Sequence, residues 1–176
     1  MSKLILVSAG HSTVPPVDPG AVGNGFVEAQ EALRLRDATA KNLREKGESV
    51  IEDGADGVNE PLKKALVLAR KADIAVEFHF NAGPPHAAGI EVLSKPSKKL
   101  LAQKIAGAIN RATGLTLRGD KGWKADNSGH HHRLAFCEAG GLIVEVCFIS
   151  NKSDMLAYKN NFAKIAENLA EVLSEA

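Results

Sequence analysis

The sequence is poor in cysteine and in net charge, and each shortage excludes a class of protein. Its two cysteines, Cys137 and Cys147, do not form a CxxC pair, which argues against a disulfide framework or a thiolate metal site. We expect packed or free thiols at both positions. Lys and Arg number 22 against 21 Asp and Glu, so a formal charge of +1 supplies no strong field for nucleic acid or anionic lipid.

Long apolar runs and a secretory signal are also missing. No stretch approaches the roughly 18 apolar residues that a membrane helix needs, and the first residues lead directly into a short apolar strand. We therefore expect synthesis in the cytoplasm, no stable membrane insertion and a monomer. A length of 176 residues with 44% hydrophobic content fits one domain with a substantial core.

Apolar runs and helical periodicity alternate along the chain. Buried strands are predicted at residues 4–7, 49–52, 73–81, 89–94 and 142–149. Helices are predicted at residues 26–46, 60–71, 98–113 and 159–173, and residues 114–141 form a long excursion with weak periodicity. This alternation predicts an α/β fold, with a mostly parallel twisted sheet flanked by helices on both faces.

Polar residues interrupt two of the predicted strands. The period of two in residues 73–81 places Glu77, His79 and Asn81 on one face. Glu145 lies inside the apolar run of residues 142–149. Removing a carboxylate from water costs several kcal/mol, about 2 or more, unless a partner or a raised pKa compensates. A functional role for Glu145 is therefore expected.

Two histidines and one glutamate of the chain could be the donors of a catalytic metal site. His11 follows the first strand and His79 lies near the end of the third, so the carboxyl edge of a parallel sheet could bring them together. A third ligand could come from Glu28, at the start of the first long helix, with Glu31 as the fallback. An acidic residue in the first turn also suits the helix dipole alone. With six His in the chain, spacing alone leaves many trios open.

The excursion of residues 114–141 is rich in cations and contains three consecutive histidines, His130, His131 and His132. Arg118, together with Lys121 and Lys124, could clamp carboxylates of a ligand, although a solvated basic loop is an equally good interpretation. Trp123 could stack on a sugar or anchor the loop.

Six ordered segments resemble the zinc-dependent N-acetylmuramoyl-L-alanine amidases. Gly10-His11 is similar to the first ligand motif of that family and residues 18–23 to its D-x-G-A-x-G loop. Glu28 with Leu33 matches the glutamate ligand. The remaining matches are His79-Phe80-Asn81-Ala82, Gly89-Ile90-Glu91-Val92 and residues 144–151, which resemble the H-A-N-A, G-I-E and V-E-x-G-F-x-S-N motifs. The sequence departs from the family at Ser12-Thr13 and at Cys147, where glycines are common.

The resemblance implies a Zn2+ ion held by His11, Glu28 and His79, with Glu145 as the general base that cleaves the bond between muramic acid and L-alanine. Candidate substrate contacts are Asn81, Arg118 and His132. The partner expected is peptidoglycan, and the whole chain, residues 1–176, is expected to be the catalytic domain without a separate cell-wall-binding domain.

A phage endolysin, released to the wall by a holin-type pore, is the biological role we expect from this resemblance. The alternative is that the sequence comes from a bacterial cell-wall amidase. Two rival functions remain open at this stage: a zinc carboxypeptidase or deacylase that uses the same ligands, and a noncatalytic wall-binding module. The presence of Glu145 argues against the second rival, because binding alone needs no buried base.

Overall fold

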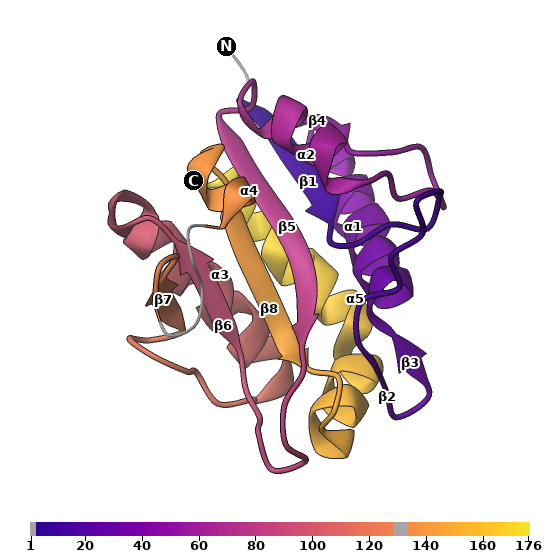
Figure 1. Ribbon diagram of the computed structural model, residues 1–176. Coiled ribbons are helices and arrows are strands. Elements are labelled where there is room, and N and C mark those ends of the chain that lie inside the picture. The colour runs from indigo at the N-terminus through magenta and orange to yellow at the C-terminus, as the bar shows by residue number, and fades with distance from the viewer. Residues whose placement is uncertain (1–2, 129–133) are drawn as a thin grey trace.

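Six strands form the central sheet, in the order β4-β1-β5-β8-β6-β7 (Figure 1). Neighbouring strands are parallel except β6 and β8, which pair antiparallel. The computed structural model describes residues 3–128 and 134–176. The strands are β1 (Leu4–Ala9), β4 (Ser49–Glu52), β5 (Ile74–Asn81), β6 (Glu91–Ser94), β7 (Trp123–Ala125) and β8 (Leu142–Phe148). The predicted α/β fold with a mostly parallel sheet is confirmed.

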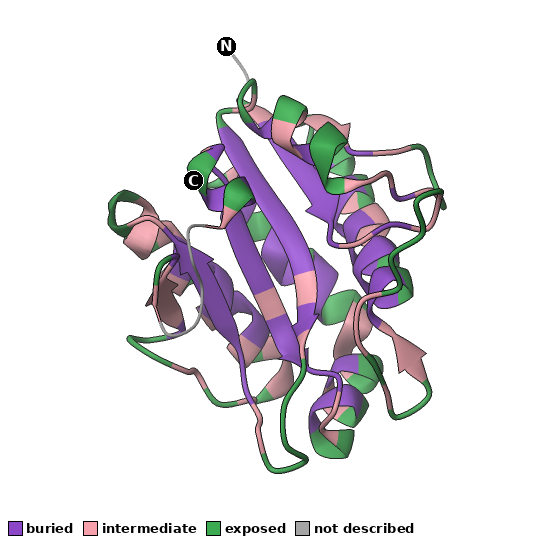
Figure 2. Ribbon diagram, in the orientation of Figure 1, coloured by how far each residue is buried: buried purple, intermediate pink, exposed green. Residues whose placement is uncertain are grey.

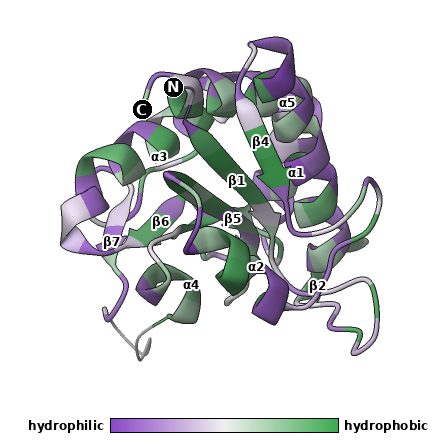
Figure 3. Cartoon of the chain, turned by 90° about the horizontal axis from the view of Figure 1, so that it is seen from above, coloured by the Kyte–Doolittle hydropathy of each residue, from purple (hydrophilic) through white to green (hydrophobic). Residues whose placement is uncertain are grey.

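Helices cover both faces of this sheet, as the view from above shows (Figure 3). The helices are α1 (Glu28–Glu45), α2 (Leu62–Ala69), α3 (Lys99–Thr113), α4 (Ala135–Glu138) and α5 (Lys152–Ser174). The long helices α1, α3 and α5 pack together on one face, whereas the short helices α2 and α4 lie on the other. The second layer is therefore much the smaller of the two.

The period of two explains how each face meets its helices. Alternate residues such as Val7 and Phe78 enter the core shared with α1 and α5, while Leu6 and Ile143 pack against α2 and α4. Further along the strands, the face that carries α2 and α4 becomes polar. The residues there are Ser8 on β1, Glu77 and His79 on β5, and Glu145 on β8.

The pairing of β5 with β8 contains a register shift just beyond this polar patch. His79 lies opposite Glu145, but Asn81 lies opposite Phe148, so β8 has one additional residue there. Such a bulge reverses the face on which the following side chains lie. Cys147 consequently turns into the core, where its Sγ lies 3.7 Å from the Sδ of Met155.

The described structure differs from the sequence-based elements mainly in short segments. The first predicted helix began two residues early, because Phe26–Val27 forms β3, which pairs with β2 (Val22–Gly23). The last helix begins at Lys152 rather than at residue 159, since the Asn151 side chain caps it by accepting from two backbone amides. A 3-10 turn (Pro96–Lys98), β7 and α4 were not predicted, being too short to show periodicity.

Both cysteines are buried and free, as predicted. Within residues 3–128 and 134–176, no helix has the length and apolar character needed to cross a membrane.

Candidate metal and catalytic site

His11 reaches the site from a turn that follows β1. Its backbone lies in the left-handed region, with φ of 68°, which is strained for a non-glycine residue. Asn59 compensates for this strain, because its side-chain amide donates to the carbonyl oxygens of Ala9, Gly10 and His11 at 2.9 to 3.0 Å. Gly10 is needed here, since a Cβ at this position would lie 2.2 Å from the His79 ring.

The His11 ring is held between two carboxylates. Its Nδ1 lies 2.9 Å from Asp18 Oδ2, and its Nε2 lies 3.0 Å from Glu28 Oε1. Burial alone would lower the pKa of His11, but the hydrogen bonds with Glu28 and Asp18 raise it overall. Asp18 thus orients the ring so that Nε2 points at Glu28.

Glu28 is the first residue of α1, yet its carboxylate does not cap that helix. One oxygen, Oε1, lies 3.0 Å from His11 Nε2 and 3.1 Å from His79 Nδ1, and it also accepts from the Phe80 amide. The other oxygen accepts from the Ala21 amide at 2.8 Å. Burial would raise the pKa of this carboxyl, but the two imidazoles hold it far below its usual range. The helix dipole is therefore not the main reason for an acidic residue at this position.

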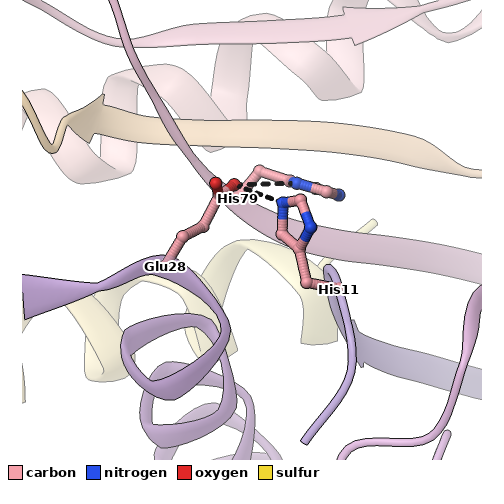
Figure 4. A group of neighbouring side chains, drawn as sticks. All are labelled: His11, Glu28 and His79. Atoms are coloured by element: carbon pink, nitrogen blue, oxygen red, sulfur yellow. Dashed lines mark hydrogen bonds and ion pairs between the residues drawn. The ribbon is translucent and has the colours of Figure 1, made fainter. Parts of the chain in front are cut away.

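His79 completes the group from β5. Its Nδ1 faces Glu28 (Figure 4). Its Nε2 lies 3.0 Å from Glu77 Oε1. Burial opposes protonation of this ring, but Glu28 and Glu77 raise the pKa of His79 well above its ordinary value. Glu77 is therefore the partner that orients His79.

The three inner atoms, His11 Nε2, Glu28 Oε1 and His79 Nδ1, form a set that could hold a metal ion. One donor atom from each residue lies within 4.8 Å of the others. Each imidazole also has a carboxylate on its outer nitrogen, the usual arrangement around a metal-binding histidine. This convergence fits the two-His, one-carboxylate set of a catalytic zinc site. A pocket of about 340 Å³, lined in part by His11, Asp18, Glu77 and His79, opens beside it.

Glu31, the fallback ligand, takes no part in this group. Its carboxylate pairs with Arg34 at 3.0 Å, one turn further along α1.

Glu145 lies opposite His79, on the neighbouring strand β8. Its Oε2 is buried without a hydrogen-bond partner among the described residues. Burial, reinforced by the charges of Glu28 and Glu91, raises the pKa of Glu145 to about 7, although His79 opposes this rise. His79 and Glu145 are both partly exposed. Figure 2 shows that the rest of β5 and β8 is mostly buried. An unsatisfied carboxylate of this pKa suits proton transfer at neutral pH.

Two of the candidate substrate contacts meet at Glu91, the residue opposite Glu145 on β6. Asn81 donates to one oxygen of Glu91 at 3.0 Å, while Arg118 and Lys124 each approach the other at 2.6 Å. Two cations therefore pair with the one carboxylate of Glu91. Contact of Asn81 and Arg118 with substrate stays a prediction.

The other residues of the basic excursion are placed differently. Trp123 donates from Nε1 to Ser94 Oγ at 3.0 Å and has Lys99 over its ring, which supports an anchoring role. Lys121 lines a separate hollow of about 740 Å³ beside Asp73 and Leu117. His132, with His130 and His131, lies outside the described residues.

Comparison with known proteins agrees with this geometry. A family model described as N-acetylmuramoyl-L-alanine amidase matches residues 5–175. A putative N-acetylmuramoyl-L-alanine amidase from Neisseria meningitidis is 40% identical, with 98% of this chain and 94% of that one covered and a TM-score of 0.88. An uncharacterized protein of Bacillus subtilis, YqiI, is 27% identical over 86% of this chain and 73% of its own length.

More distant structures share the fold. The catalytic domain of CwlV, an N-acetylmuramoyl-L-alanine amidase from Paenibacillus polymyxa, is 23% identical, covers 98% of this chain and 97% of its own, and has a TM-score of 0.82. Since one family model spans nearly the whole sequence, the chain belongs to the N-acetylmuramoyl-L-alanine amidases and is a hydrolase that acts on peptidoglycan.

Proposed function

We propose that this amidase is zinc-dependent, with His11, Glu28 and His79 as ligands and Glu145 as the general base. The observation that carries the proposal is the single oxygen of Glu28 that faces both imidazoles, beside Glu145, whose Oε2 has no hydrogen-bond partner in the part of the chain that the structure describes. Zn2+ at this site would lower the pKa of water and polarise the scissile carbonyl.

The residues of the chain supply the proton transfers. Glu145 accepts the proton of the attacking water and, once protonated, donates it to the nitrogen that leaves as the amino group of L-alanine. In the metal-free protein the pKa of Glu145 is about 7, so this carboxyl can both release and take up a proton near neutral pH. Asp18 and Glu77 fix the two imidazoles through their outer nitrogens.

A lytic role is the finer biological proposal. The fold is shared with the catalytic domain of the CD27L endolysin, at 23% identity, 97% and 96% coverage and a TM-score of 0.77. That identity supports the fold alone, and bacterial amidases fit equally well. The lytic role is therefore tested by whether the protein lyses whole cells.

The ligand set predicts different outcomes for two glutamates on the same turn of α1. Glu28→Gln should weaken Zn2+ binding by roughly 100-fold or more, because loss of a direct ligand exceeds the ~10 to 100-fold effect of outer partners. Glu31→Gln, which alters a carboxylate paired with Arg34 rather than with either imidazole, should bind Zn2+ as the parent does. Competition with a chromophoric chelator measures both. A loss confined to Glu31→Gln would reverse the assignment.

The general-base role predicts that Glu145→Gln keeps its metal but loses turnover. We expect about 100-fold or greater loss of activity on purified peptidoglycan, since a positioned base contributes ~10² to 10⁴-fold. The parent protein should release stem peptides with free L-alanine amino termini, detected by mass spectrometry, and chelation followed by zinc return should remove and restore this activity. Release of terminal residues or acyl groups instead would favour a carboxypeptidase or deacylase. Zinc binding and wall binding without turnover in the parent would favour the noncatalytic module.

The raised pKa of Glu145 also predicts the pH dependence of stability without metal. Between its usual value of 4.5 and about 7, the folded protein binds more protons than the unfolded chain, so stability falls as pH rises through that range. Glu145→Gln removes this dependence and should be about 1–3 kcal/mol more stable above pH 7. Urea unfolding in chelator at several pH values tests this, with the exposed Glu171→Gln as the matched control. Parallel curves for the parent and Glu145→Gln would contradict the shift.

The lytic role predicts that purified protein clears suspensions of cells whose membranes have been permeabilised, and that Glu145→Gln does not. Turbidity and released amino termini are followed together. Cleavage of purified peptidoglycan without any clearing would leave the amidase reaction intact and reject the lytic role.

A further inference from the structure

A cluster of buried charged and polar residues lies next to His79. None of these residues is assigned to metal ligation or to proton transfer. Arg36 on α1 and Asp53 after β4 are both 0% exposed, as is Ser8 on β1. Glu77, the outer partner of His79, is 3% exposed. Groups of this kind are costly to bury unless they are paired, so their arrangement needs a reason.

These residues form one continuous chain of hydrogen bonds that ends at His79. Arg36 donates from Nη1 to Asp53 Oδ1 at 3.1 Å. The Ser8 hydroxyl then lies 2.7 Å from Asp53 Oδ2 and 3.2 Å from Glu77 Oε2. The other oxygen of Glu77 lies 3.0 Å from His79 Nε2.

Ser8 is the link that joins the two halves of this chain. Glu77 has one oxygen on His79, and its other oxygen meets the Ser8 hydroxyl. Ser8 lies on β1 and Glu77 opposite it on β5, so the contact is built into the pairing of the strands. Both carboxylate oxygens of Glu77 therefore have a partner, and these two contacts fix the orientation of the carboxylate.

Asp53 holds the Ser8 hydroxyl in turn. Its position is set by Arg36 on one oxygen and by Ser8 and the Ala9 amide on the other. Burial raises the pKa of Asp53 to about 6, helped by the charge of Glu77, even though Ser8 and Arg36 lower it. The Ser8 hydroxyl has one proton, so it donates either to Asp53 or to Glu77, and it donates to Glu77 when a protonated Asp53 donates to it.

We propose that Ser8, Asp53 and Arg36 are positioning residues that hold Glu77 against His79 Nε2 and so strengthen metal binding by the ligand on the opposite nitrogen. This inference rests on the proposed function, because His79 must be a metal ligand for it to apply. Outer partners of ligating histidines typically change metal affinity by about 10 to 100-fold. Here the effect reaches the ligand through two intermediates, Glu77 and Ser8.

Ser8 is the residue at which the inference is tested most cleanly. Arg36 also donates to the carbonyls of Ala55 and Val58, so its removal would disturb a loop as well as the chain. Ser8→Ala deletes one hydroxyl and leaves the pair of Arg36 and Asp53 intact. Ser94→Ala is the matched control, because Ser94 is also 0% exposed on a strand and hydrogen-bonded, but to Trp123.

The experiment measures the Kd for Zn2+ by chelator competition, starting from zinc-loaded protein, together with the free energy of unfolding. Ser8→Ala should raise the Kd about 10-fold or more, and Ser94→Ala should leave it within about 2-fold at a similar loss of stability. A purely structural role would lower stability alone, since binding is measured on folded protein. An unchanged Kd for Ser8→Ala would overturn the inference.

A second pair of variants separates packing from hydrogen bonding and serves if Ser8→Ala does not fold. Ser8→Thr and Ser8→Val have nearly the same shape and differ in the hydroxyl. We expect Ser8→Thr to bind Zn2+ at least about 10-fold more tightly than Ser8→Val. Equal affinities would reject the role of the hydroxyl, whereas a parent protein that binds no Zn2+ would reject the proposed function itself.

Discussion

The site depends on one carboxylate oxygen that two imidazoles share. Glu28 Oε1 faces His11 and His79 while it also accepts from the Phe80 amide, so it joins the end of β1, the start of α1 and the end of β5. Taking such a group out of water costs several kcal/mol, about 2 or more, and the two imidazoles and two backbone amides offset that cost. The same contacts that keep Glu28 ionised therefore also bring the three ligand-bearing segments together.

The sheet explains why this group lies at a surface rather than inside the core. The small layer formed by α2 and α4 packs on apolar residues at one end of the strands, such as Leu6 and Ile143. Towards the other end of β1, β5 and β8, the same face carries Ser8, Glu77 and Glu145. Leu62, at the start of α2, borders the pocket there together with Glu77 and His79. Polar residues can persist on those strands because they contact each other and the pocket.

The periodicity of the sequence predicts much of this site. The prediction is weakest at residues whose position does not depend on periodicity. The alternation of residues 73–81 placed Glu77 and His79 together, and the position of His11 after a parallel strand predicted that it would reach them. Glu28 and Glu31 were harder to separate, because both lie in the first turn of α1 and both are buried. Only the orientation of the helix start decides between them. The antiparallel pairing of β6, the bulge in β8 and the Ser8 to Asp53 contact depend on residues distant in sequence, so no local pattern reveals them.

Neighbouring groups shift the pKa values of two glutamates in this site in opposite directions. Glu28 touches both imidazoles, and its pKa is held far below the usual range. Glu145 lies opposite His79 on the neighbouring strand, and its Oε2 has no partner among residues 3–128 and 134–176. Burial, together with the nearby charges of Glu28 and Glu91, raises the pKa of Glu145 to about 7. A carboxylate that stays ionised suits a ligand, whereas one that exchanges its proton near neutral pH suits a base. Because Glu28 contributes to the raised pKa of Glu145, the ligand role and the base role are produced by one arrangement of charges.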